Sequence, residues 1–215
     1  MAVPDPTPVL RFIHVDNLYI YLRRGALHAP NHTPDDGLAY KTNHNEDVQA
    51  KRRHTPIPCG PGGTVHDYVP FYFGPLSPMM LNLKTGRVPG YNDGQEPLIY
   101  LVAHAQRIVQ AGHRVVFSDG HGVAAFTEWF DGLDDLDKVD WSMVGQRYWT
   151  DNIDDMDRMR RKQAEFLVHE SLDWSLIRGI GVYDQQRKQQ VEQIMEAEHV
   201  SHRPVVKIKR DWYYH

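Results

Sequence analysis

The sequence predicts an α+β fold in a single domain over residues 1–215, and three features of its pattern support that class. Segments with strand-like and helix-like periodicity alternate along the chain. The strand-like segments are rich in aromatic and β-branched residues, which favour strands. Their spacing is uneven and does not give the regular repeat of a doubly wound parallel sheet. The length suits one domain, and no linker or internal repeat divides the chain.

The first predicted element is a short strand that passes directly into a helix within residues 9–27. An Asp-Asn pair is placed to cap this helix, and Gly25 is placed to end it. From residue 28 to residue 63 the periodicity is broken by Pro, Asn, His, Asp and Gly. A short helix over residues 46–53 is expected inside this stretch. A stretch this long with little regular structure is usually either functional or disordered.

The middle of the chain predicts three strands and one helix. The aromatic segment TVHDYVPFYFG, residues 64–74, reads as a strand interrupted at Pro70, because proline cannot donate to a strand ladder. A second strand over residues 97–104 leads into a helix that Gly112 closes. A third strand follows over residues 114–120.

The last third of the chain begins with residues 121–163, which we expect to be mainly helical. Their charge is polarised, with an acidic first part and a basic end that starts at Arg158. The remainder predicts two strands, an amphipathic helix and a final strand, over residues 164–168, 177–183, 184–199 and 203–214.

Composition excludes several classes of protein. A net charge of -4 argues against a protein that coats nucleic acid non-specifically, although clusters of basic residues leave room for a local groove. No apolar run approaches the ~20 residues of a membrane span, and the N-terminus lacks the pattern of a secretory signal. Cys59 is the only cysteine, which excludes a disulfide framework and a thiolate zinc site. We therefore expect a cytoplasmic protein with no membrane partner.

Three familiar kinds of site are not supported. The glycines of GPGGTVHDY lack the Gly-Lys-Ser/Thr ending of a phosphate loop, so a flexible turn is the better interpretation. The thirteen histidines form no H-E-x-x-H motif and have no cysteine pairs beside them, so no metal site is expected. His66 and Asp67 are neighbours in a predicted strand and face opposite ways, which disfavours a base and its orienting carboxylate.

Glu165 is a charged residue inside the apolar run AEFLV. Glutamate is rarely buried without a partner, because an unpaired buried carboxylate is costly. In a strand, Gln163, Glu165 and Leu167 share one face and the apolar neighbours share the other. From these residues alone, a carboxylate aimed into a cleft and an ion pair with an upstream arginine are equally supported.

Several motifs follow one another along the chain: IHVDNL near the start, K-R-R before the glycine-rich turn, VHDYVPFYFGPLSPMML, D-G-H after the third strand, KQAEFLV and a closing W-Y-Y. In this order they resemble the DarT family of DNA ADP-ribosyltransferases, the toxins of a bacterial toxin–antitoxin pair. The resemblance covers nearly the whole chain. It implies the ADP-ribosyltransferase fold, in which two small mixed sheets with flanking helices clasp NAD.

The resemblance also implies an activity. It is sequence-selective transfer of ADP-ribose from NAD to a nucleobase of single-stranded DNA, thymidine in the branch that the sequence most resembles. No metal takes part, and a macrodomain antitoxin reverses the modification. The alternatives are a transferase that acts on RNA or protein, a binding module that has lost its chemistry, and hydrolysis of NAD with water as the acceptor.

The family's cofactor residues map onto this sequence one by one. Glu165 resembles the catalytic glutamate, which stabilises the oxocarbenium-like centre and orients a ribose hydroxyl. The family's arginine falls on Arg52 or Arg53, and Arg52 is preferred; a guanidinium there steadies the phosphates and the transition state. His14 matches the residue that holds the nicotinamide side of NAD. Further positions near the cofactor are Asn17, Tyr72, Ser77 and Met79.

Residues 119–164 match the family's loop-and-helix element that recognises the substrate beside the glutamate. Tyr148 and Trp149 are candidates for stacking on bases. The basic end of this element is expected to face DNA and the acidic half to face solvent. The basic residues are Arg158, Arg160, Arg161 and Lys162.

Overall fold

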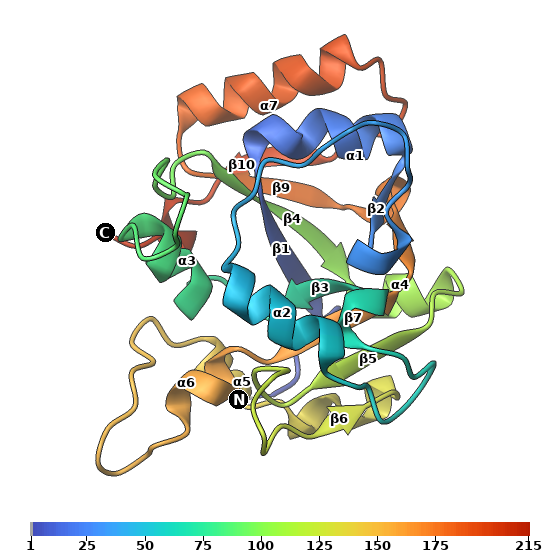
Figure 1. The fold of residues 1–215 in the computed structure, drawn as a ribbon. Coiled ribbons are helices and arrows are strands. Elements are labelled where there is room, and N and C mark those ends of the chain that lie inside the picture. The colour runs from blue at the N-terminus through green and yellow to red at the C-terminus, as the bar shows by residue number, and fades with distance from the viewer. Residues whose placement is uncertain (1) are drawn as a thin grey trace.

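The computed structural model describes residues 2–215, which form a large mixed sheet, a two-stranded sheet and seven α-helices (Figure 1). The α+β class predicted from the sequence is confirmed. The strands are β1 Pro8–His14, β2 Ala26–His28, β3 Tyr68–Tyr72, β4 Leu98–His104, β5 Val115–Ser118, β6 Trp129–Phe130, β7 Glu165–His169, β8 Ser171–Asp173, β9 Gly179–Val182 and β10 Val205–Ile208. The helices are α1 Leu18–Arg24, α2 Glu46–His54, α3 Pro78–Lys84, α4 Ala105–Gln110, α5 Trp141–Val144, α6 Arg158–Lys162 and α7 Gln185–Ala197.

The large sheet consists of two halves that meet at a single register position. Its strand order is β10-β9-β4-β1-β3-β7-β5-β6, and β2 pairs with β8 in the small sheet. Strands β1 and β4 pair along their whole length, whereas β1 and β3 pair only at Leu10 and Tyr72. The two small sheets expected from the family are therefore present as two half-sheets joined at one point. Beyond that point β1 and β3 diverge.

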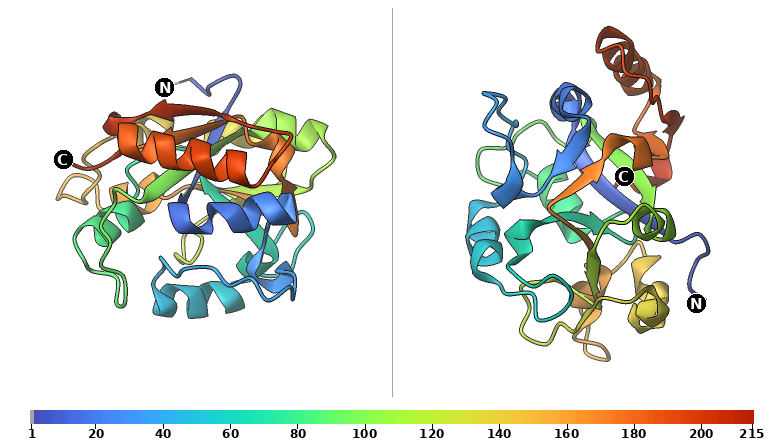
Figure 2. Two further views of the ribbon diagram at one scale, coloured as in Figure 1. Left: turned by 90° about the horizontal axis from the view of Figure 1, so that it is seen from above. Right: turned by 90° about the vertical axis from the view of Figure 1, so that its right-hand side faces the viewer.

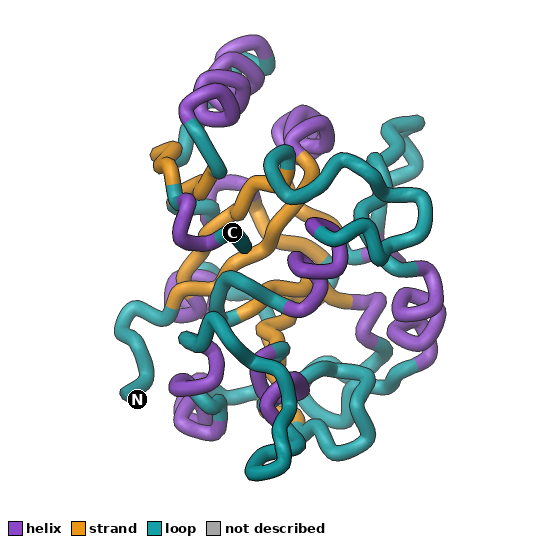
Figure 3. The backbone as a smooth tube through the Cα atoms, turned by 90° about the vertical axis from the view of Figure 1, so that its left-hand side faces the viewer, coloured by secondary structure: helices purple, strands orange, loops and turns teal. Residues whose placement is uncertain are grey.

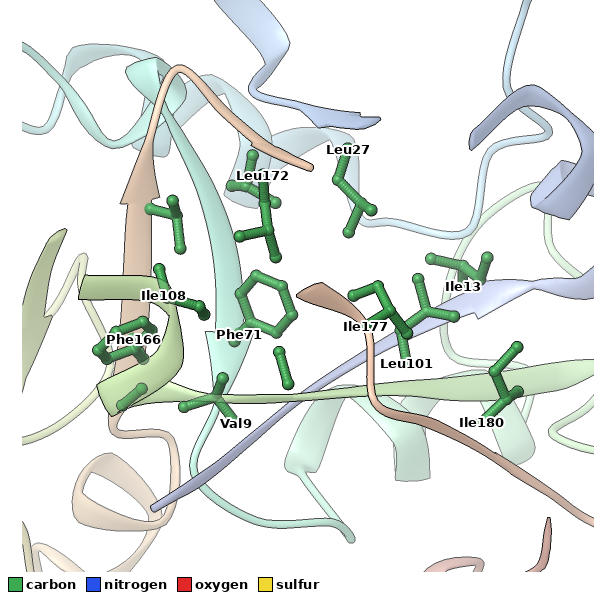
Figure 4. Packing of buried hydrophobic residues seen from close by; sticks show 14 of the residues in the cluster. Val9, Ile13, Leu27, Phe71, Leu101, Ile108, Phe166, Leu172, Ile177 and Ile180 are labelled. Carbon is green, nitrogen blue, oxygen red and sulfur yellow. The ribbon is translucent and has the colours of Figure 1, made fainter. Parts of the chain in front are cut away.

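The apolar core fixes these strands by alternation, because successive residues of a strand face opposite sides. In β1, Val9 and Ile13 pack into the largest cluster, whereas Leu10 belongs to a second cluster on the opposite face. In β7, Phe166 lies in the large cluster and Leu167 in a third (Figure 4). Both faces of β7 beyond Glu165 are thus anchored in apolar packing.

Helices and loops surround this central layer of strands (Figure 3). Helices α1 and α7 lie side by side (Figure 2), and α7 connects β9 to β10, which pair in parallel. Gly25 ends α1 with a φ of +64°, as its position predicted. The Asn45 side chain caps α2 by accepting a hydrogen bond from the Val48 N–H at 3.1 Å. The predicted helix at residues 46–53 is confirmed.

Two predictions about local structure are wrong. Strand β3 runs through Pro70 without interruption. Proline cannot donate a backbone hydrogen bond, but none is needed here, because β1 has already diverged from β3 at this position. Residues 121–163 are not mainly helical. They hold the two-residue β6, the short α5 and α6, and a 3₁₀ helix over residues 133–138, because aspartates there bond to turns and loops rather than continue a helix.

No helix within residues 2–215 has the length and apolar character needed to cross a membrane.

Candidate active site

A cavity of about 750 Å³ opens where β1 and β3 diverge between the two half-sheets. Strands β1 and β3, helix α2 and the segment 28–46 supply most of its wall, and the start of β7 reaches it from one side. A volume of this size is typical of sites for small molecules and cofactors. Six of the residues that the sequence singled out line it: Asn17, Arg52, Arg53, Tyr72, Met79 and Glu165.

Glu165 and Arg52 form a two-bond ion pair in the cavity wall. Arg52 Nη1 donates to Glu165 Oε1 at 2.9 Å, and Nη2 donates to Oε2 at 2.7 Å. Glu165 is 2% exposed and Arg52 is 7% exposed. The ion pair and the carboxylate at a cleft, which the sequence left as alternatives, are therefore the same arrangement. Arg53, the next residue of α2, is exposed at the cavity rim.

The backbone around Glu165 holds its carboxylate in place. Its N–H donates to Ser118 Oγ at 3.2 Å, and Oε1 accepts the Gly122 N–H at 3.0 Å. A Cβ at Gly122 would lie 3.2 Å from Oε1, so glycine is what permits this approach. Within the described residues Oε2 has Arg52 as its one hydrogen-bond partner, and a carboxylate oxygen accepts more than one bond. Oε2 can therefore accept a hydroxyl from a ligand.

Electrostatics keep this carboxylate charged. Burial alone would raise the pKa of Glu165, but the adjacent Arg52 guanidinium and the Gly122 N–H outweigh burial and lower that pKa below its usual value. Burial acts to lower the pKa of Arg52, and Glu165 reverses this and raises it. Burial, aided by Glu165, raises the pKa of Tyr72 to about 12, so its phenol is a neutral hydrogen-bond donor at pH 7.

His121 also lines the cavity, and the sequence did not single it out as a site residue. It follows β5 and lies close enough to Glu165 for each to influence the pKa of the other. Burial lowers the pKa of His121 more than Glu165 raises it, so the imidazole is neutral at pH 7. The D-G-H motif was the available signal, because it placed a histidine directly after a predicted strand.

Asn17 lines the cavity, whereas His14 is not among its lining residues. The His14 side chain is buried, its Nδ1 accepts the Asp16 N–H at 3.1 Å, and its Nε2 lies 3.1 Å from Asp93 Oδ2. Burial lowers the pKa of His14. The Asn17 amide makes two hydrogen bonds to the backbone of Lys41, at 2.9 and 2.7 Å. Asn17 thus holds the segment that carries Lys41 in the cavity wall.

Ser77 and Met79 have different places. Ser77 is buried and is not part of the cavity lining; its Oγ accepts the Met80 N–H at 3.3 Å and caps α3. Met79, in the first turn of that helix, lines the cavity. Ser77 therefore acts on the cavity through the position of α3.

The basic end of the substrate element is bound to the protein's own acidic residues, contrary to the expectation that it faces DNA. Arg160 donates to Asp119 at 2.8 Å and to Asp157 at 2.7 Å. Arg161 pairs with Asp140 and Asp155. The aspartates in these pairs, Asp140, Asp155 and Asp157, are partly exposed and also bind the arginines of the basic end. The sequence showed both charge blocks but not the turns that bring them together.

Lys162 is buried and donates from Nζ to Val144 O at 2.6 Å and to Gln146 O at 2.8 Å. Burial lowers its pKa to about 8. Its ammonium thus holds the start of the loop between α5 and α6 and is buried rather than turned outward.

The loop between α5 and α6 projects from the body of the protein (Figure 1). Tyr148 in this loop is 80% exposed, as a stacking residue would be, but Trp149 is 9% exposed and donates from Nε1 to Tyr214 Oη at 2.6 Å. The stacking role expected for Trp149 does not fit this buried position. Arg158 stabilises the loop by donating to Tyr148 O at 2.7 Å and Thr150 O at 3.0 Å.

Residues 2–215 contain no group of three or more His, Cys, Asp or Glu side chains arranged to hold a metal ion.

Comparison with known proteins adds independent information. Residues 10–214 match the family described as DarT, ssDNA thymidine ADP-ribosyltransferase. A DNA ADP-ribosyl transferase of Thermus sp. (strain 2.9) is 40% identical over 211 residues, which cover 98% of each chain. The structure of Thermus sp. 2.9 DarT in complex with ADP-ribosylated ssDNA superposes with a TM-score of 0.92 at 38% identity, covering 100% of this chain and 99% of that one. The same protein in complex with NAD+ gives a TM-score of 0.87 at 38% identity, covering 99% of this chain and 100% of that one.

Proposed function

The chain belongs to the DarT family of single-stranded-DNA thymidine ADP-ribosyltransferases, and we propose that its cavity binds NAD and transfers ADP-ribose to a thymidine of single-stranded DNA. The observation that carries this proposal is the buried Arg52–Glu165 pair in a cavity of about 750 Å³ between the half-sheets. The Thermus relative of the same fold has been captured with NAD+ and with modified DNA.

Glu165 is the catalytic carboxylate in this proposal. When the bond between nicotinamide and ribose breaks, neutral nicotinamide leaves and positive charge develops at C1′ of the ribose. The ionised carboxylate accepts a ribose hydroxyl at Oε2 and stabilises that charge from a fixed position. As the thymine ring nitrogen bonds to C1′, its proton leaves, and Glu165 receives it as the general base in this proposal.

Arg52 keeps Glu165 ionised and correctly oriented. Its two parallel N–H···O bonds fix both carboxylate oxygens in one plane. Without them, burial would favour the protonated form, which neither stabilises a cation nor accepts a proton. Arg52 is therefore preferred to the exposed Arg53 as the catalytic arginine, and Arg53 is placed to contact the cofactor at the rim.

The remaining site residues position the donor in this proposal. We assign the nicotinamide side to His14, whose ring is fixed by Asp16 and Asp93, and to Tyr72 and Met79 in the cavity wall. The Tyr72 phenol, which is neutral at pH 7, donates a hydrogen bond there. Asn17 contributes by fixing the wall segment, and Ser77 by fixing α3.

The DNA reaches this site along the loop between α5 and α6 in our proposal. Tyr148 is the exposed aromatic residue of that loop. Met159 of α6 lines the cavity and is also 42% exposed. Stacking on such side chains tolerates any base, so selection of a target sequence requires further polar contacts. Arg158 is the residue of the basic end that supports the Tyr148 backbone directly.

The experiment is a panel of single-stranded oligonucleotides that each contain one thymidine, incubated with NAD and analysed by mass spectrometry. The proposal predicts a gain of one ADP-ribosyl group that depends on the thymidine and on single strands. Modification of matched RNA or of protein instead would identify a different acceptor, and free ADP-ribose without DNA dependence would identify NAD hydrolysis. Binding of DNA without consumption of NAD would identify a module without chemistry.

We further propose that the protein acts as a toxin in the cytoplasm and that a macrodomain antitoxin removes the modification it makes, as the family resemblance implies. Expression of the active chain should arrest growth, and co-expression of a macrodomain hydrolase that removes ADP-ribose from thymidine should restore growth. Arrest that the hydrolase does not relieve, while the DNA is unmodified, would count against this role.

A further inference from the structure

Arg11 is a cavity residue to which the chemistry above gives no task. It lies on β1 between the core residues Val9 and Ile13 and shares their face of the strand. An arginine on a core face needs an explanation, because charged side chains are seldom placed there. Its side chain nevertheless lines the cavity between the half-sheets.

The guanidinium of Arg11 is only partly used by the protein. Nη1 donates to Pro70 O at 3.0 Å. Nε is buried and has no hydrogen-bond partner among residues 2–215, a condition shared in that range only with Arg187 Nε. None of the ion pairs formed by the described residues includes Arg11. A buried, charged donor that lacks a partner is costly and calls for a ligand to complete it.

Arg11 lies at the point where the half-sheets separate. Strands β1 and β3 pair at Leu10 and Tyr72, and continuing that antiparallel register would place Phe12 opposite Pro70. Pro70 has no N–H to donate, and its carbonyl accepts the Arg11 side chain. The guanidinium therefore takes the place of ladder bonds across the opening, at the floor of the cavity.

The charge balance of the cavity leaves Arg11 free for an anion. Two carboxylates line the cavity: Glu165, which is bound by Arg52, and Glu46, which is exposed in the first turn of α2. Of the three lining arginines, Arg11 and Arg53 have no carboxylate partner, and Arg53 is solvent-exposed. The positive charge of Arg11 also acts on Tyr72: burial raises the pKa of Tyr72, and Arg11 lowers it.

We propose that Arg11 binds the pyrophosphate of the NAD donor through the guanidinium N–H groups that Pro70 O does not accept. These groups have no partner among the described residues, and charge-assisted hydrogen bonds from a guanidinium to phosphate oxygens are strong. The inference rests on the proposed function, because it takes NAD as the ligand of the cavity. Arg11 thus holds the donor at the opening between the half-sheets, with the reactive ribose directed toward Glu165.

The test compares ligands with and without phosphate. Dissociation constants of ADP-ribose and of adenosine are measured by calorimetry for the wild type, Arg11→Gln and the control Arg107→Gln, an exposed arginine of α4 outside the cavity lining. Arg11→Gln should weaken ADP-ribose binding about 10-fold or more, the effect of losing charge-assisted bonds, and change adenosine binding less than about 2-fold. Equal losses for both ligands, or no loss for either, would overturn the proposal.

Arg11→Lys keeps the charge but loses the planar guanidinium donors, and it covers the case in which Arg11→Gln does not fold. It should weaken ADP-ribose binding and spare adenosine, whereas parallel losses would again overturn the proposal. Transfer to a thymidine oligonucleotide is measured alongside with the wild type. Absence of transfer with Arg11-dependent binding of ADP-ribose would reject the proposed function and keep this inference. Transfer to the oligonucleotide, with binding of ADP-ribose that does not depend on Arg11, would keep the proposed function and reject this inference.

Discussion

Arg52 and Glu165 are 113 residues apart in the sequence and meet through two hydrogen bonds of 2.9 and 2.7 Å. Both residues are almost fully buried. Burying two charges costs hydration that their attraction does not always recover. The pair is nevertheless placed at the wall of the cavity, where an ionised carboxylate of fixed orientation is what the transfer reaction requires. The pair also couples α2 to β7.

Removing one member of the pair should destabilise the protein. Glu165→Ala or Arg52→Ala leaves an unpaired buried charge, and each should lower the free energy of unfolding by about 3–5 kcal/mol. The double variant should lose less than the sum, because no charge is left unpaired. Urea denaturation of the four proteins measures this coupling. Strictly additive losses would show that the two side chains do not interact as described.

Tyr148 and Trp149 should respond in opposite ways to truncation. Tyr148→Ala removes an exposed ring, so the melting temperature should stay unchanged while the KM for DNA rises. Trp149→Ala removes a buried ring and its hydrogen bond to Tyr214, and should cost about 3–5 kcal/mol of stability. Calorimetry and transfer kinetics distinguish the two. A large loss of stability from Tyr148→Ala would contradict its exposed position.

The basic end of the substrate element should act on stability more than on DNA affinity. Arg161→Gln breaks the pairs with Asp140 and Asp155 and should loosen the loop between α5 and α6. If Arg161 contacted a DNA phosphate, its loss would make the slope of log K for single-stranded DNA against log salt concentration shallower by about 0.7. For Arg161→Gln we expect a smaller change in that slope, together with faster proteolysis of the loop. A slope reduced by the full amount would show that Arg161 contacts DNA.

Stability should fall as the pH is lowered from 7 toward 5. Burial is the leading cause of a lowered pKa at six histidines: His14, His28, His66, His104, His121 and His169. The unfolded chain protonates these groups near their ordinary value of 6.5, whereas the folded chain keeps them neutral to lower pH. The stability they provide is therefore full above about pH 6.5 and is lost as the pH falls through the folded values.

Urea midpoints measured at pH 7.5, 6.5 and 5.5 test this dependence, and His66→Gln should reduce the change between them. His66 is a suitable position because its side chain is buried against Gln49 and its substitution removes one titrating group. Midpoints that stay constant over this range would contradict the assignment of neutral buried histidines.

Local sequence rules recovered much of the fold, because its elements carry local signals. The stop of α1, the helix over residues 46–53 and the alternating faces of β7 follow from neighbouring residues. The expected side-chain cap of α1 does not form, because the Asn17 amide bonds to the backbone of Lys41 instead. The path of β3 through Pro70 could not be predicted this way, since it depends on the divergence of β1. The loop-rich character of residues 121–163 depends equally on ion pairs between residues far apart in the sequence, such as Arg161 with Asp140.

The site was predictable to the extent that motifs carried it. Motifs placed Glu165, Arg52 and His14, and the structure brings Arg52 and Glu165 into contact. No motif could show that Trp149 is buried, because its partner Tyr214 lies 65 residues further along the chain. The role proposed for Arg11 was hidden for the same reason, since its free N–H groups are visible only beside Pro70.

The measurement that tests the central claim most directly is transfer by Glu165→Gln, followed by mass spectrometry of a thymidine oligonucleotide incubated with NAD. Glutamine keeps the size of the side chain and removes its charge, so NAD should still bind while modification of the oligonucleotide is lost. Calorimetric titration with NAD verifies the first part. Modification at the wild-type rate by Glu165→Gln would contradict the assignment of Glu165 as the catalytic carboxylate.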